Sequence, residues 1–155
     1  MPPGYNAGMA IQGASPTGTG LRVLSAVMGL FLVLMGTGKW GWLADPGFLI
    51  WQLEEWQALT SGASLWYLET VALPGAPVFA RVVPLAEIAA GAALLAGFQV
   101  RLTATIALLM ILNFHFASGI MFTAGYLTNG YGPPVLGGLL ALAIGGRTLP
   151  FSLTR

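Results

Sequence analysis

The sequence predicts an all-α integral membrane protein, a four-helix bundle whose N-terminus and C-terminus both lie on the cytoplasmic side. The chain has 155 residues, of which 56% are hydrophobic and only 7% are charged, whereas soluble domains carry about 25% charged residues. Such a chain cannot cover a water-facing surface. It also contains four apolar runs of helical length, which are expected to cross the bilayer at about 21–42, 82–98, 102–122 and 133–147.

Both ends of the chain are expected to lie outside a single membrane domain that covers residues 21–149. Residues 1–20 are rich in Gly, Pro, Ser and Thr, which predicts a flexible leader. A signal peptide is disfavoured, because the first apolar run ends in MGTGKWGW and not in a small-residue cleavage site. Residues 150–155 are expected to form a tail that is too short to fold.

The first helix carries a stripe of small residues. Ser25 and Gly29 lie four residues apart, and Gly36 follows two turns later on the same side. Small residues at this spacing let a neighbouring helix approach closely. Arg22 and Lys39 flank the apolar centre of the helix, and their long side chains can extend toward the nearer membrane surface.

The outer connection, residues 44–80, contains a segment with helical spacing at 48–59. Its apolar stripe consists of Leu49, Leu53 and Trp56. This spacing predicts a short amphipathic helix, which either lies on the membrane surface or packs as a lid on the end of the bundle. The sequence leaves both arrangements open. Pro74 and Pro77 are expected to end the connection.

Two of the later helices each carry an ionisable residue inside an apolar run, Glu87 in the second helix and His115 in the third. Such residues are costly in hydrocarbon, so they face protein, a cavity or a partner charge. At 1.5 Å per residue, Glu87 is about 9 Å and His115 about 10 Å from the outer ends of their helices. With Lys39 near the outer end of the first helix, they form a candidate polar site. Asn113 is expected to point to the opposite side of its helix.

The candidate site has several interpretations. Glu87 and His115 form a proton relay or bind a quinone head group, or Glu87 forms a buried ion pair that fixes the packing. Lys39 is favoured over Arg81 as the partner in that pair, because Arg81 points to the other side of its helix. His115 is either a hydrogen-bonded core residue or the ligand of a haem or chlorophyll-type pigment. One His and one Glu are too few for a closed metal site.

Charge and cysteine content exclude some functions and suggest an orientation. A net charge of +1 gives no basic patch for nucleic acid, and the absence of cysteine excludes thiol–disulfide catalysis by the chain itself. Basic residues favour the cytoplasmic side of a membrane protein. With the N-terminus inside, four basic residues are cytoplasmic: Arg22, Arg101, Arg147 and Arg155. The other two, Lys39 and Arg81, lie outside with the acidic connection.

Several short motifs occur in a fixed order. GTGKW ends the first helix at residues 36–40, PLAEIAAGAALLAGFQVR follows at 84–101, and NFHF ends a later helix at 113–116. In this order they resemble the DoxX/DoxD-like family of small membrane proteins, over about residues 21–147. The resemblance implies a four-helix bundle in the prokaryotic cytoplasmic membrane, with relatives that include the small subunit of an archaeal thiosulfate:quinone oxidoreductase. The family's recurring polar positions are matched by Lys39, Glu87, Arg101 and His115.

Two function classes follow. The favoured one is an accessory or scaffold subunit of a larger energy-converting membrane complex, respiratory or photosynthetic, which has no catalytic activity of its own and contacts other membrane subunits as well as lipid. The alternative is a quinone-linked redox subunit with a quinone or proton site near Glu87 and His115. The sequence shows no electron carrier of its own, which favours the first class. A small-solute transporter is disfavoured, because the chain lacks paired discontinuous repeats.

Overall fold

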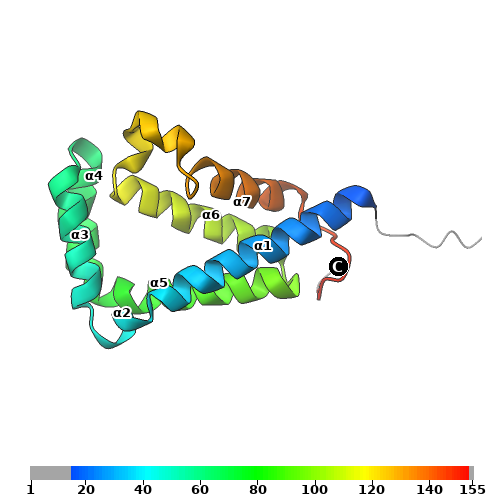
Figure 1. Ribbon diagram of the computed structural model, residues 1–155. Helices are drawn as coiled ribbons and strands as arrows, with labels where there is room; N and C mark the ends of the chain where they lie inside the picture. Colours follow the sequence, from blue (N-terminus) through cyan, green and yellow to red (C-terminus); the bar gives the residue numbers. More distant parts are fainter. Residues whose placement is uncertain (1–14, 154–155) are drawn as a thin grey trace, which may run out of the picture.

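The computed structural model describes residues 15–153, and within that range the chain is helical, with no strand. The all-α class predicted from the sequence is therefore confirmed. Four helices run side by side along one direction (Figure 1): α1 (Pro16–Gly38), α5 (Leu73–Ala96), α6 (Val100–Ala117) and α7 (Pro133–Gly145). Residues 1–14, which include most of the predicted leader, lie outside the described residues.

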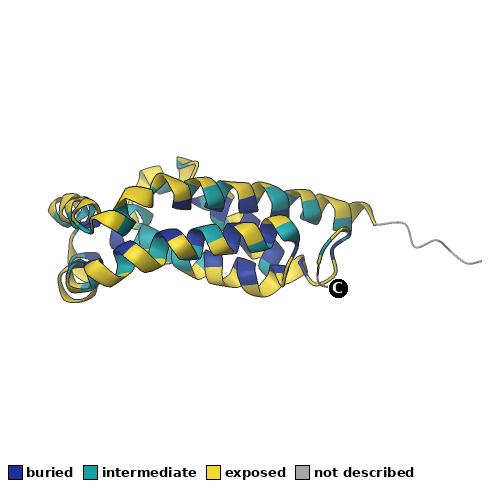
Figure 2. Cartoon of the chain, turned by 90° about the horizontal axis from the view of Figure 1, so that it is seen from below, coloured by how far each residue is buried: buried dark blue, intermediate teal, exposed yellow. Residues whose placement is uncertain are grey.

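The helices have the length and composition of a multi-pass membrane protein. Three helical stretches are long and apolar enough to cross a bilayer, Pro16–Gly38, Gly62–Ala96 and Val100–Ala117, and α7 is a shorter apolar helix. Their outer faces are exposed while the buried residues point inward between the helices (Figure 2). On α1 the outer stripe consists of Val23, Val27, Leu30 and Leu34, each more than half exposed. Exposed aliphatic stripes of this kind suit contact with lipid tails.

The closest contact between helices joins α1 to α5. A Cβ atom added to Gly29 would lie 2.7 Å from the carbonyl oxygen of Gly91, and one added to Gly91 would lie 2.6 Å from that of Gly29. At Gly36, an added Cβ would lie 2.8 Å from the carbonyl oxygen of Pro84. The small residues predicted to admit a neighbouring helix therefore lie against α5, where two backbones meet without side chains between them.

The second pair of helices, α6 and α7, shares the main hydrophobic core with α1 and α5. The α7 core face contains Gly138 and Leu142, both buried, and Gly138 lies against Met28 of α1. Gly137, by contrast, is exposed, and a Cβ atom added to it would have no neighbouring atom within 4 Å. Residues on the core side of α7 therefore determine its orientation.

The outer connection is more helical than the sequence predicts. The amphipathic helix is present as α3 (Gly47–Leu59), and it lies across one end of the long helices, beside α4 (Gly62–Tyr67) (Figure 1). Leu49 and Leu53 are buried there against a second hydrophobic cluster: Leu68, Ala72, Ala76, Ala80 and Ala117. α3 therefore packs on the end of the bundle through Leu49 and Leu53, while Phe48 and Trp51 remain exposed.

The prediction that Pro74 and Pro77 end the connection is wrong. A π-helical turn, η1 (Leu68–Ala72), joins α4 directly to α5, so helical structure continues from Gly62 to Ala96. Pro74 follows this turn directly and lies inside the continuous helical stretch, where proline cannot donate the usual backbone hydrogen bond. The π turn before it supplies the local widening that helices adopt at such irregular points.

Other helix boundaries also differ from the prediction. The first helix begins at Pro16 and not near 21, so residues 16–20, predicted as part of the flexible leader, belong to α1. The first helix ends at Gly38 rather than near 42, and α2 (Trp40–Ala44) follows after Lys39. The third ends at Ala117 rather than at 122, because Gly119 takes a left-handed conformation with φ of 69° and terminates it. Short 3₁₀ turns follow, η2 (Ile120–Phe122) and η3 (Ala124–Thr128).

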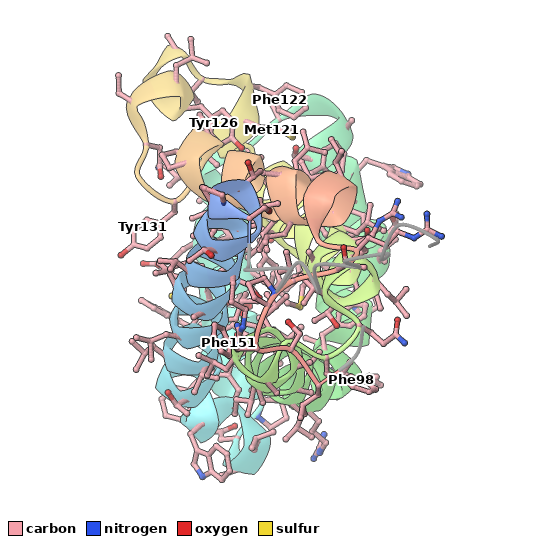
Figure 3. The ribbon with its side chains drawn as sticks, turned by 90° about the vertical axis from the view of Figure 1, so that its right-hand side faces the viewer. Phe98, Met121, Phe122, Tyr126, Tyr131 and Phe151 are labelled. Carbon is pink, nitrogen blue, oxygen red and sulfur yellow. The ribbon has the colours of Figure 1, made fainter. Side chains whose placement is uncertain are left out.

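At the end away from α3, arginines cap the helices. Arg22 donates hydrogen bonds to the carbonyl oxygens of Leu94 (3.2 Å) and Leu95 (2.6 Å) in the last turn of α5, and to that of Phe151 (3.2 Å). The Leu94 carbonyl also accepts from the Gly97 N–H at 3.2 Å and from the Ser25 hydroxyl at 2.8 Å, so this end of α5 is bonded both to its own cap and to α1. The segment after α7 is predicted as an unpacked tail, but the Leu153 N–H donates to the Ala96 carbonyl. Figure 3 views this end, with Phe98 at the α5–α6 turn and Phe151 in the final segment.

Candidate functional site

A buried ion pair links α1 to α5. Lys39 Nζ lies 2.8 Å from both carboxylate oxygens of Glu87, whose side chain is 1% exposed. Lys39 occupies the break between α1 and α2, and its Nζ also donates to the Met35 carbonyl at 3.2 Å. Gly36 makes room for the carboxylate, because a Cβ there would lie 3.1 Å from the Cβ of Glu87. The predicted partner of Glu87 is thus the observed one, and Arg81 instead donates to the Pro77 carbonyl.

Aromatic rings surround the ammonium group of Lys39. Its Nζ lies 5.8 Å from the ring centroid of Trp42 and 5.8 Å from that of Phe114. A cation at this distance is attracted by the electron-rich faces of aromatic rings. An ammonium group carries three N–H donors, and Glu87 and Met35 accept all of them. Lys39 is therefore fully bonded within the chain, and it presents a positive charge beside an aromatic wall.

A cavity of about 300 Å³ lies beside Lys39, lined by residues from the ends of α1 and α6 and from the crossing helix α3. Its wall is mainly aromatic and aliphatic. The rings in the wall belong to Phe31, Trp42, Trp56, Tyr67, Phe79, Phe114, His115 and Tyr131. The amides of Gln52 and Asn113 also border it. Glu87 itself is fully buried and does not line the cavity.

His115 lines the same cavity, but its depth differs from the prediction. Because α6 ends at Ala117, His115 stands in the last turn of the helix and not seven residues inside it. Its Nδ1 lies 2.9 Å from the hydroxyl of Tyr126, and the two rings meet edge to face with centroids 5.4 Å apart. Tyr126 comes from η3, which folds over the end of α6 (Figure 3).

The hydrogen bond between His115 Nδ1 and the Tyr126 hydroxyl links the tautomer of His115 to which of the two groups donates. A tyrosine hydroxyl is protonated near neutral pH at its usual pKa of 10, and burial raises the pKa of the Tyr126 phenol further, so this hydroxyl keeps its proton. It can then donate to Nδ1, which leaves the ring proton of neutral His115 on Nε2. An Nε2–H group on a cavity-lining ring is a hydrogen-bond donor for a ligand.

The structure thus brings the predicted residues together in part. Lys39 contacts Glu87, and Lys39 and His115 line one cavity, but no hydrogen bond joins Glu87 to His115 among residues 15–153. Asn113, predicted to point away from the site, borders the cavity while remaining exposed. Tyr126 and the aromatic residues of α3 were missed, since their positions depend on how the connections fold over the helix ends. In the described part of the chain, no group of three or more His, Asp or Glu side chains could hold a metal ion.

The cavity limits which cofactors fit. At about 300 Å³ it stands at the lower end of ligand pockets, which span about 300–1,000 Å³. This space suits one substituted ring better than the much larger macrocycle of a haem or chlorophyll. None of the family models, curated proteins or solved structures compared with this chain matches it.

Proposed function

We propose that this chain binds the ring head group of a membrane quinone in the cavity beside Lys39. The observation that carries the proposal is the lining, a mainly aromatic and aliphatic wall with a few polar groups. Pockets of this composition bind planar apolar molecules and orient them by a small number of hydrogen bonds. The placement between apolar helices gives a hydrophobic ligand access from the bilayer.

Each polar group has a role in this proposal. The Nε2–H of His115 donates to one quinone carbonyl oxygen, and the amide of Asn113 or Gln52 donates to the other. Lys39 keeps its bonds to Glu87 and supplies a fixed positive charge at the wall, where partial negative charge on the ring oxygens is favoured. The Lys39–Glu87 pair holds α1 and α5 in register and so positions the cavity.

A second proposed function is that of an accessory subunit in a larger energy-converting membrane complex. It is supported by exposed aromatic side chains on the crossing helices α3 and α4. Lipid contact along the outer faces of the long helices does not account for these side chains, because they belong to other elements. Phe48, Trp51 and Trp66 are 57%, 59% and 62% exposed. A protein interface is enriched in such residues. Purification in mild detergent tests this function, since we expect further subunits to co-purify, and a monomer that purifies without any other subunit would contradict it.

We further propose four membrane spans with both termini in the cytoplasm of a prokaryotic cell, as the resemblance to DoxX-like proteins implies. Three arginines support the orientation: Arg22 and Arg101 cap helices at one end, and Arg147 follows α7 there. The acids of the connection lie at the opposite end, in α3 and η1. Basic residues favour the cytoplasmic side.

Quinone binding can be measured by tryptophan fluorescence, because Trp42 and Trp56 line the cavity. We expect a short-chain quinone to quench the emission of the purified protein with a saturable dependence. His115→Phe keeps the ring and removes the donor, so it should weaken binding up to about tenfold, the equivalent of one hydrogen bond. Gln57→Met is the control, since Gln57 bonds Glu69 outside the cavity. Equal affinity of wild type and His115→Phe would refute the assigned donor, and the absence of saturable quenching would refute the site.

A further inference from the structure

A second pocket, of about 420 Å³, lies at the opposite end of the molecule, between the start of α6 and the end of α7. It is distinct from the aromatic cavity and shares no residue with it. Two arginines line it, Arg101 from α6 and Arg147 after α7. The remaining wall is formed by Gln99, Val100, Leu102, Thr105, Ala143 and Gly146.

The guanidinium group of Arg101 is held in place at the pocket. Its Nε donates to the Ala143 carbonyl at 3.0 Å, near the end of α7. This bond uses one of the five N–H donors of the side chain, and it ties the group between the two helices. A guanidinium fixed by its Nε offers its terminal N–H groups as a fork, which matches the geometry of phosphate oxygens.

No carboxylate neutralises these arginines within residues 15–153. The five acids of the chain all lie between residues 45 and 87, and the ion pair in the described structure joins Lys39 to Glu87. Four of the acids belong to the crossing helices and their connections, at the far end of the molecule (Figure 1). Within residues 15–153, two cations therefore share a pocket without a counterion from the chain, which favours an anionic ligand.

The surroundings indicate which anion source fits. Leu102 lines the pocket and begins an exposed apolar stripe along α6 that continues through Ile106 and Leu109, with exposures of 58%, 53% and 61%. Across from it, Ile144 of α7 is 70% exposed. A cationic pocket that opens onto an apolar track running along a membrane-spanning helix has the layout of a phospholipid, with a charged head and a long tail.

We propose that this pocket binds the phosphate head group of an anionic phospholipid, and that an acyl chain of that lipid lies along Leu102, Ile106 and Leu109. Arg101 and Arg147 contact the phosphate oxygens. The lipid bridges the start of α6 and the end of α7 and so stabilises this pair of helices. The inference is independent of quinone binding, since the two sites lie at opposite ends.

The test measures lipid binding to the delipidated full chain in detergent, by native mass spectrometry and by thermal stability. Dioleoyl phosphatidylglycerol and dioleoyl phosphatidylcholine are the two probes. We expect tighter binding and a larger rise in Tm with phosphatidylglycerol. Arg147→Gln should weaken that binding about fivefold, the equivalent of roughly 1 kcal/mol per basic residue near a membrane surface. Arg147 is exposed and its loss should leave the fold intact. Arg101→Gln should weaken binding at least as much.

Arg81→Gln is the matched control, because Arg81 is an exposed arginine on α5 outside this pocket. It should bind phosphatidylglycerol like the wild type. If Arg81→Gln and Arg147→Gln lose affinity equally, binding reflects overall charge and the proposed site is wrong. Inorganic phosphate is the third probe. If it stabilises the protein as much as phosphatidylglycerol does, the pocket binds a soluble anion and the lipid assignment is overturned.

Discussion

At the scale of single residues, the Lys39–Glu87 pair shows how a chain can place a carboxylate in its apolar interior. Both carboxylate oxygens accept a hydrogen bond from one ammonium group, and Met35 accepts the remaining donor. A buried charge that is both paired and hydrogen-bonded avoids the large cost of an isolated one. Removing one partner of such a pair is far more costly than replacing both partners with apolar residues.

The first prediction concerns this pair. Glu87→Gln should lower the free energy of unfolding by about 3–5 kcal/mol, because the buried ammonium of Lys39 loses its counter-charge. Lys39→Met should have a similar effect. The double variant should be no less stable than either single variant, since neither charge is then left alone. Thermal unfolding in detergent measures all three, with Glu54→Gln, an exposed acid, as the control. Additive losses would show that the pair contributes no coupling.

The second prediction concerns the tautomer of His115. Tyr126→Phe removes the hydroxyl that bonds Nδ1, so the ring proton should redistribute between Nδ1 and Nε2. The chain contains a single histidine, and its ¹⁵N NMR signals therefore need no further assignment. We expect the wild type to show a protonated Nε2 and an unprotonated Nδ1 at neutral pH, and the variant to show a mixture. An Nδ1–H signal in the wild type would disprove the proposed donor direction.

Much of the residue-level pattern could be predicted from the sequence, and the failures have a common cause. The Lys39–Glu87 pair follows from helix depth and rotation, which local geometry determines. The environment of His115 does not, because it depends on Gly119 ending α6 and on Tyr126 returning over that end. A helical wheel also places Asn113 away from the site, whereas a cavity at a helix end is open to more than one side of the helix.

At the scale of elements, the contact between α1 and α5 organises the packing. Gly29 and Gly91 bring the two backbones together, so each carbonyl oxygen occupies the space where the other residue would carry a side chain. The sequence predicts the α1 half of this contact from the spacing of Ser25, Gly29 and Gly36. It does not predict that helical structure starts at Gly62, because Pro74 and Pro77 read as breaks while the π turn before them has no clear sequence signal.

The third prediction tests this contact. Gly91→Ala should destabilise the protein by about 1–3 kcal/mol, since the new methyl group overlaps the backbone of α1 and the helices have to separate. Gly137→Ala is the matched control on α7, where the methyl group meets no neighbouring atom. There the better helix propensity of alanine should leave stability unchanged or raise it by up to about 1 kcal/mol. Thermal unfolding in detergent compares them, and equal Tm values would contradict the close backbone contact.

At the scale of the whole molecule, charge is divided between two ends. Arginines cap helices at the end that holds both described chain termini, and the acids lie around the crossing helix α3 at the other (Figure 1). The aromatic cavity lies at the end that holds most of the acids, and the arginine-lined pocket lies at the other end. Arginines gathered at one end of the helices favour a single orientation of the chain in a membrane.

The fourth prediction is the direction of insertion. The chain has no cysteine, so a single introduced one can be labelled without background. Ser61→Cys, between α3 and α4, should react with a membrane-impermeant maleimide added outside intact cells. Thr148→Cys, beyond α7, should react only after the cells are opened; both positions are exposed and neutral, so neither change alters the charge balance. Labelling of position 148 from outside would reverse the proposed orientation.

The bonds made by Arg22 also set an order of events during synthesis. Its acceptors on α5 are made more than seventy residues later, and Phe151 is made 129 residues later. A ribosome therefore releases α1 into the membrane long before this arginine can find its partners in the chain. Water and lipid phosphates at the bilayer surface have to solvate it during that time. The hydrogen bonds by which Arg22 joins α1 to α5 and to the last segment are therefore complete only after α7 has been made.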